Sequence, residues 1–258
     1  QYWSEVIAYR VGCEMGVQVP PAFAAWNSET GICGALIEWF FTDGQEASVL
    51  GGDLLQKIHP DFDREKGRTH NVQDNANLMR ALSIGAGLST NWRLWWAGAL
   101  VFDALIGNTD RHQDNWSVIF SLANGRTTGC KLSPYFDNGT SLGSELNLSR
   151  VGIWSDEQLD RYIFRGTHHI RWRDSGTAAE LQSCTHIDLV RRVLTLWPKV
   201  RAEVADLLDT LTPQRLEQAL MDLTSIDLPV PLSTHRLAFA TRLLARRLQL
   251  LKTACRPL

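Results

Sequence analysis

One short stretch carries most of the information in this chain, IGNTDRHQDNW (residues 106–116). It holds Asp110 and Asn115 in the spacing D-x-x-x-x-N, and a further acid, Asp137, follows in SPYFDNG (residues 133–139). Phosphoryl transfer needs a carboxylate that orients and deprotonates the attacking hydroxyl, and oxygen ligands that hold magnesium against the nucleotide phosphates. Asn115 and Asp137 are ligands of the type that magnesium prefers, and Asp110 suits the role of the base.

The alternative interpretation is that these residues only form turns, because Asn, Asp and Gly are common in loops. The flanking sequence favours a phosphotransfer site over simple turns. Residues 91–106 predict a helix, with capping side chains at Ser89 to Asn91 and a stop at Gly107. Residues 116–120 and 130–132 predict two strands around the turn Asn124-Gly125. The resulting hairpin carries Asn115 at its entry and Asp137 just past its exit.

A helix, an acid-bearing loop, a hairpin and a metal-binding acid, in that order, resemble the catalytic core of protein-kinase-like enzymes. The residues themselves resemble the HipA-like serine/threonine kinases, most specifically in GNTDRHxxN (107–115) and LSPYFD (132–137). Weaker similarity extends over a first helix from Gln1 to about Gly16, VQVPP (17–21), and the strand and hinge GALIEWFF (34–41).

This resemblance implies an α+β, protein-kinase-like fold. Residues 1–44 would be the remnant of a small lobe, with a helix, strands and the hinge. Residues 45–258 would form a mostly helical large lobe that carries the catalytic loop 107–116 and the metal-binding segment 132–139. The activity implied is that of an ATP- and Mg²⁺-dependent protein serine/threonine kinase, with Asp110 as catalytic base and Asn115 and Asp137 as magnesium ligands.

The resemblance also implies four nucleotide contacts. His112 would lie near the phosphates, and Glu38 and Phe40 would contact adenine mainly through backbone groups. Glu5 would pair with the nucleotide-binding lysine. That lysine and a Gly-rich loop normally precede the first helix, and no G-x-G-x-x-G or G-x-x-x-x-G-K-[ST] motif occurs in the sequence. We expect the upstream strands to exist in the natural protein; a partner that supplies them, or a degenerate kinase, are the alternatives.

Two other classes of function remain open. A phosphoinositide-kinase-like lipid kinase shares the D-x-x-x-x-N arrangement, but the basic membrane-facing loop that it needs is not evident. A non-catalytic, kinase-like binding or regulatory module is favoured by the missing lysine and disfavoured by the intact Asp110, Asn115 and Asp137. The family resemblance implies a protein substrate and a toxin–antitoxin setting, with a small DNA-binding antitoxin as partner.

Composition limits the other possibilities. The chain has 258 residues and a formal net charge of −2, without a long block of Lys and Arg, so we expect no direct binding to nucleic acid. No apolar run approaches the ~20 residues that span a bilayer, so we expect no membrane association. The five cysteines are scattered and lack C-x-x-C spacing, which argues against disulfides and structural zinc and favours a cytoplasmic location.

The remaining sequence is predicted to be mainly structural. Tryptophans 92, 95, 96 and 197 are interpreted as core residues, and helices are predicted at residues 187–197, 200–211, 216–223 and from about 233. The basic residues of the last helix, Arg242, Arg246, Arg247 and Lys252, are expected to form a solvated edge. For Arg165, His168 and His169 we adopt a structural or solvated role, with contact to phosphate or substrate as the alternative.

Overall fold

The computed structural model describes residues 2–147, 149, 154–174 and 180–256; Gln1, the start of the predicted first helix, lies outside them. The fold is mixed α and β, as expected from the sequence. Its elements in chain order are α1 (Tyr2–Met15), β1 (Ala22–Trp26), β2 (Cys33–Ile37), β3 (Glu46–Leu50), α2 (Gly51–Ile58), α3 (Val72–Gly85), α4 (Trp92–Ile106), β4 (Ser117–Ala123), β5 (Arg126–Leu132), α6 (Asp156–Arg165), β6 (Trp172–Arg173), β7 (Leu181–Gln182), α7 (His186–Leu196), α8 (Arg201–Asp209), α9 (Pro213–Leu220) and α10 (Thr234–Cys255), with 3₁₀ turns at Pro198–Val200 and Met221–Ser225.

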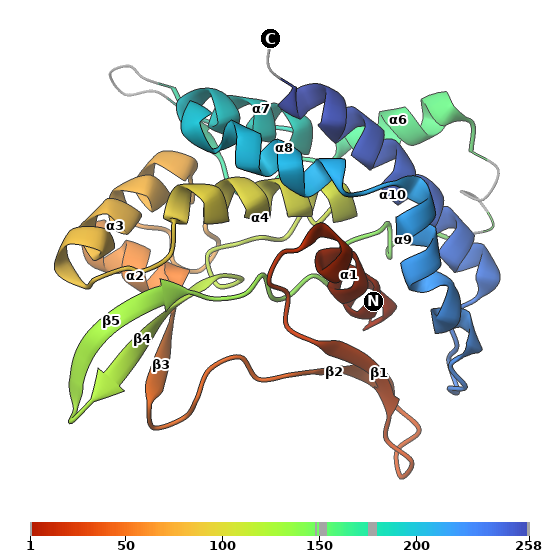
Figure 1. The fold of residues 1–258 in the computed structure, drawn as a ribbon, viewed down its shortest axis with the longest axis horizontal. Coiled ribbons are helices and arrows are strands. Elements are labelled where there is room, and N and C mark those ends of the chain that lie inside the picture. The colour runs from red at the N-terminus through yellow and green to blue at the C-terminus, as the bar shows by residue number, and fades with distance from the viewer. Residues whose placement is uncertain (1, 148, 150–153, 175–179, 257–258) are drawn as a thin grey trace.

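Helix α4 lies at the centre of the molecule, between the C-terminal helices and the strands (Figure 1). The side chain of Asn91 caps its first turn by accepting from the Leu94 amide at 3.4 Å. Gly107 ends it with φ of 72°, in the left-handed region. A Cβ at this position would lie 2.7 Å from the Arg247 guanidinium, so both conformation and space require glycine. The predicted helix 91–106 is therefore confirmed to within one residue.

The predicted hairpin forms a sheet with a strand that the sequence did not indicate. Strands β4 and β5 are joined at Asn124 and Gly125, which both have positive φ (50° and 71°) as a tight hairpin turn requires. Strand β3 pairs with β4 in an antiparallel register from Leu50↔Ser117 to Glu46↔Ser121. The three-stranded sheet lies below α4 in Figure 1.

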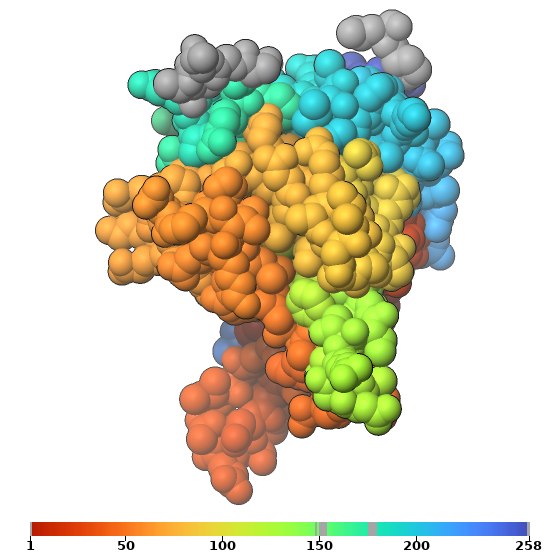
Figure 2. Space-filling view, turned by 90° about the vertical axis from the view of Figure 1, so that its left-hand side faces the viewer, coloured from red at the N-terminus to blue at the C-terminus, as the bar shows by residue number. Residues whose placement is uncertain are grey.

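Strands β1 and β2 form a separate two-stranded ribbon, paired from Ala22↔Ile37 to Trp26↔Cys33. Helix α1 packs against both strands, including a Tyr9–Phe23 ring contact at 6.3 Å. Large apolar side chains nevertheless remain exposed on the ribbon, with Phe23 at 54% and Trp26 at 47%. Figure 2 shows the red-orange N-terminal residues and the green β4–β5 hairpin extending from the broad helical part of the molecule.

The C-terminal helices are confirmed, but one interpretation of them is wrong. The arginines of α10 do not form a solvated edge: Arg246 pairs with Asp160, and Arg242 lies 2.6 Å from Asp156, both acids of α6. Arg247 is buried and donates to the Ala104 carbonyl of α4 at 3.0 Å. Long cationic side chains bury their stems while the charged heads find partners, which a helical pattern alone does not reveal.

The tryptophans interpreted as core residues are mostly buried. Trp92, Trp96 and Trp197 are each at most 5% exposed, and Trp95 is partly buried. Trp96 and Trp116 meet edge to face with ring centroids 5.1 Å apart, which links α4 to the start of β4. Among the described residues, no helix is both long and apolar enough to cross a membrane.

Candidate functional site

The side chain of Asn108 joins the catalytic loop to the segment that contains Asp137. Its Oδ1 atom accepts from the Asp110 amide and from the Thr140 hydroxyl, both at 3.0 Å. Its Nδ2 group donates to the Asp137 carbonyl at 3.4 Å and to Asp103 Oδ1 at 3.3 Å. Asn108 is fully buried, so these four bonds fix the two loops relative to each other.

Arg111 makes a second connection between the same loops. Its guanidinium binds Asp103 of α4 through two bonds, Nε to Oδ2 at 3.0 Å and Nη2 to Oδ1 at 2.7 Å. Nη1 donates to the carbonyl oxygens of Asn115, at 2.9 Å, and Phe136. Nη2 also donates to Asn138 Oδ1 at 2.9 Å. The arginine next to the predicted base therefore points into the protein and holds the backbone on both sides of the site.

Asp103 is the buried anion that makes this arrangement possible. Burial alone would raise its pKa, but the charge of Arg111 and the bond from His168 lower the pKa of Asp103 to about 2. His168 Nδ1 accepts from the Ile170 amide at 3.0 Å, so the ring proton lies on Nε2, 3.1 Å from Asp103 Oδ2. The role of His168 is therefore structural, as expected from the sequence.

The groups of the catalytic loop that would meet a ligand are left free. Asn115 donates from Nδ2 to the Asp110 carbonyl at 2.7 Å, which leaves its Oδ1 as the available atom. Neither this oxygen nor the Asp110 carboxylate accepts a hydrogen bond from another residue in the described part of the chain. An amide oxygen and a carboxylate held by backbone bonds in one short loop form a suitable acceptor set for a cation or a hydroxyl.

Asp137 lies at an unusual backbone position beside Glu5. Its φ is +57°, in the left-handed region, which is uncommon for a non-glycine residue. Glu5 of α1 accepts from the Asn138 amide at 2.8 Å. Burial raises the pKa of Glu5, and the nearby charge of Asp137 raises it further. The two acids predicted from distant parts of the sequence are therefore neighbours.

Phe40 lies against the metal-binding segment. Its ring stacks on Phe136, directly before Asp137, with centroids 5.2 Å apart and an interplanar angle of 22°. Glu38 is exposed, and its amide already donates to the Pro21 carbonyl at 2.8 Å. Of the Glu38 backbone groups predicted to contact adenine, the carbonyl is thus the one that remains for a ligand.

His112 is on the opposite flank of the loop, in a group of histidines. Its Nδ1 atom accepts from the Asp114 amide at 3.1 Å, and its ring centroid lies 5.9 Å from that of His169. Within the described residues, no three His, Cys, Asp or Glu side chains are placed to hold a metal ion. Any magnesium at this site would therefore need Asn115 and phosphate or water oxygens in addition to Asp137.

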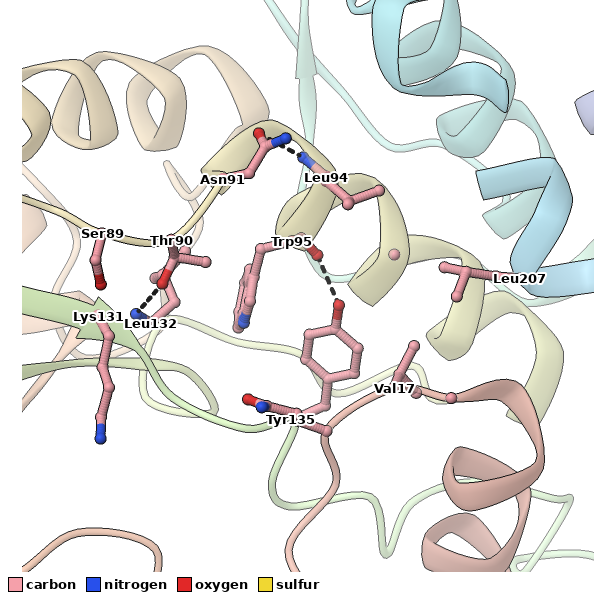
Figure 3. Close-up of a pocket in the computed structure, with 13 residues that line it drawn as sticks. Val17, Ser89, Thr90, Asn91, Leu94, Trp95, Lys131, Leu132, Tyr135 and Leu207 are labelled. Carbon is pink, nitrogen blue, oxygen red and sulfur yellow. Dashed lines mark hydrogen bonds between the residues drawn. The ribbon is translucent and has the colours of Figure 1, made fainter. Parts of the chain in front are cut away.

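A cavity of about 470 Å³ lies behind the metal-binding segment (Figure 3). Tyr135, two residues before Asp137, lines it and donates its hydroxyl to the Trp95 carbonyl at 2.9 Å. Leu132 contributes its amide to Thr90 Oγ1 at 3.0 Å. None of Asp110, Asn115 and Asp137 lines this cavity, so it is separate from the candidate site.

Sequence reasoning singled out Asp110, Asn115 and Asp137 but missed the buried side chains that hold their loops. Asn108 and Arg111 lie inside the quoted motif, yet their connections to residues 137 and 138 were not foreseen. Asp103 gave the clearest available signal: it is a single acid inside the apolar run WRLWWAGALVFDALI (92–106), and a buried carboxylate requires a partner.

Comparisons with known proteins support the fold. No protein-family model and no curated protein matches the sequence. Among solved structures, the proinflammatory kinase CtkA of Helicobacter pylori is similar, with a TM-score of 0.71 and 16% identity over 98% of this chain and 80% of that one. HipA of Shewanella oneidensis MR-1, solved with HipB and operator DNA, has a TM-score of 0.57 and 14% identity, and the match covers 98% of this chain and 55% of HipA. The chain therefore has an α+β, HipA-like kinase fold.

Proposed function

We propose that this protein is a serine/threonine protein kinase of the HipA-like type, which transfers the γ-phosphoryl group of ATP to a hydroxyl of a protein. One observation carries the proposal. Two buried side chains, Asn108 and Arg111, connect the loop of Asp110 and Asn115 to the segment of Asp137. Phosphoryl transfer depends mainly on such positioning, because the protein supplies little covalent chemistry.

Each residue has a definite task in this proposal. Asp110 orients the acceptor hydroxyl and takes its proton. Asn115 Oδ1 and the Asp137 carboxylate would hold Mg²⁺, whose charge stabilises the phosphates when ATP is bound. Glu5 borders Asp137 and bonds the Asn138 amide, which keeps the metal-binding segment against α1.

The adenine end of the nucleotide would lie at the hinge. The Glu38 carbonyl is free of the ribbon's own bonds, and Phe40 offers its backbone beside the Phe136 stack. His112 would lie near the phosphates. We also propose that residues 1–44 act as the part of a small lobe that closes over the nucleotide and residues 45–258 as the large lobe.

A calorimetric titration with ATP, with and without Mg²⁺, combined with a phosphate-transfer assay, tests the function. We expect Mg²⁺-dependent binding that Asp137→Ala abolishes, because Asp137 is exposed and its loss removes the only carboxylate assigned to the metal. Asp110→Asn should retain nucleotide binding and lose about 10²–10⁴ in transfer rate, the usual contribution of a general base.

The alternatives give different results in the same assays. Unchanged transfer in Asp110→Asn would contradict the assignment of the base. Magnesium-dependent ATP binding without transfer to any protein would favour a regulatory module, and transfer to vesicle lipids would favour a lipid kinase. Asp43→Asn is a suitable control, because Asp43 is exposed and its side chain bonds only the neighbouring Gly44 amide.

The similarity to HipA supports a partner of a defined kind. That protein was solved with HipB and operator DNA, so we propose that this protein is part of a toxin–antitoxin system and binds a small DNA-binding antitoxin. Because ATP is an intracellular metabolite, the proposed activity also requires a cytoplasmic location. All five cysteines are free thiols, which is compatible with a reducing compartment.

A further inference from the structure

A recessed pocket of about 450 Å³ lies on the flank of the catalytic loop where His169 is found. Four separate parts of the chain form it: residues 66–68, Thr109, residues 165–169 with Arg171, and Ser183. Thr109 directly precedes Asp110, and consecutive Cα atoms are ~3.8 Å apart, so the pocket adjoins the predicted base. Neither Asn115 nor Asp137 lines it, which separates it from the proposed metal position.

The charge of this pocket is strongly one-sided. Four cationic side chains line it, and no carboxylate among the described residues does; the cations are Lys66, Arg68, Arg165 and Arg171. Arg68 has a single weak ion pair, with Asp63 at 3.9 Å. The other three side chains have no recorded ion pair or hydrogen bond within the described residues. Other arginines do have acidic partners, as Arg64 has with Asp53 and Asp114.

Hydrogen bonds within the protein hold two residues of the pocket wall, His168 and Gly67, in place. His168 is held by Asp103 and by the Ile170 amide. Gly67, with φ of 59°, bonds the Asp63 carbonyl through its amide at 2.8 Å. His169 also lines the pocket, and its Nε2 atom is buried without a hydrogen-bond partner among the described residues.

We propose that this pocket binds an anionic side chain of the protein substrate, close to the hydroxyl that is phosphorylated, an inference that rests on the proposed kinase function. Clusters of Arg and Lys recognise phosphoryl and carboxylate groups through charge-assisted hydrogen bonds. Both groups share this chemistry, and either would place the acceptor residue next to Asp110. The protein would then select acidic or previously phosphorylated sequences.

A protein side chain fits the pocket better than a nucleic acid does. The pocket is recessed and local, whereas nucleic-acid binding requires an extended basic surface that follows many phosphates. The chain as a whole has a formal net charge of −2, so the excess of positive charge at this place is not a general property of the surface.

Binding of labelled peptides, measured by fluorescence anisotropy, tests the proposal without requiring catalysis. The peptides share one serine and carry alanine, aspartate or phosphoserine at each flanking position in turn. We expect aspartate or phosphoserine at one or two positions to strengthen binding about tenfold over alanine. The two acidic series distinguish a carboxylate from a phosphoryl ligand.

The double variant Lys66→Gln/Arg165→Gln should remove this preference, because both side chains are exposed, line the pocket and have no ion pair to lose. The matched control Arg126→Gln/Lys199→Gln removes the same charge from exposed positions outside the pocket and should retain the preference. Equal binding of acidic and alanine peptides, or an equal loss in both double variants, would overturn the proposal. Pocket-dependent binding of a short RNA but of no acidic peptide would overturn it in favour of a nucleic acid.

A parallel titration with Mg²⁺ and ATP separates the two proposals. Nucleotide binding without any preference for acidic peptides would be compatible with the kinase function and would reject only the proposed anion-binding role of the pocket. Binding of acidic peptides that depends on Lys66 and Arg165, without nucleotide binding, would support anion binding in the pocket and reject the kinase function.

Discussion

The loop of Asp110 and Asn115 and the β1–β2 ribbon, which leads into the segment of Glu38 and Phe40, are held in very different ways. The loop is anchored by buried charges and amides that are almost completely hydrogen-bonded, with Asp103 at 0% and Arg111 at 1% exposure. The ribbon is held by a two-stranded ladder and by α1, and it leaves Phe23 and Trp26 about half exposed. The buried polar network of Asp103 and Arg111 therefore holds the loop in one position. Substitutions in the ribbon are expected to cost less stability.

Breaking the network should have the largest effect on stability. Arg111→Met leaves the Asp103 carboxylate buried without its cation, which typically costs about 3–5 kcal/mol. The double variant Asp103→Asn/Arg111→Met should be more stable than the single variant, because no uncompensated charge remains. Urea unfolding followed by circular dichroism measures both.

Exposed Arg126→Met serves as the control for loss of an arginine. If Arg111→Met lowers the free energy of unfolding by no more than this control does, the Asp103–Arg111 pair does not anchor the loop. The loop would then be held no more firmly than the ribbon.

His186 makes the same network sensitive to acid. Its Nε2 atom lies 2.7 Å from the Asn108 carbonyl, so the neutral ring donates there. Burial lowers the pKa of His186 to about 3, and the charge of Arg247 acts in the same direction. Because the folded pKa lies below the unfolded value of ~6.5, stability is complete above pH ~6.5 and is lost as the pH falls towards 3.

The variant His186→Gln should reduce this acid sensitivity, because glutamine can donate to the Asn108 carbonyl without titrating. The expected loss in the wild type is on the order of a few kcal/mol between neutral pH and pH ~4. Thermal unfolding at a series of pH values measures it, with exposed His235→Gln as the matched control. Parallel pH profiles for the wild type and His186→Gln would show that this histidine does not cause the loss.

The smallest effect is expected in the ribbon. Trp26→Ser should change the free energy of unfolding by no more than about 0.5 kcal/mol, because the side chain is 47% exposed and packs on one face only. The same urea titration applies. A loss comparable to that of Arg111→Met would mean that the ribbon is as tightly integrated as the loop.

Local sequence signals predicted much of the framework correctly. Asn91 and Gly107 set the ends of α4, and Asn124-Gly125 set the β4–β5 turn, because capping and positive φ depend on a few adjacent residues. The last helix followed from apolar periodicity, and the first from the family resemblance. The capping box of Ser155 and Gln158 that starts α6 was also local, but it was overlooked.

What the sequence by itself determined was the succession of α4, the following loop and the β4–β5 hairpin, and the proposal for Asp110, Asn115 and Asp137, since these depend on residue type and short spacing. Only the tertiary structure decided how they are held. The pairing of β3 with β4, the burial of Arg247, and the pocket built from residues 66–68, 109, 165–169, 171 and 183 all join segments far apart in the chain. Such contacts depend on packing and on the need to pair buried charges, which local patterns do not encode.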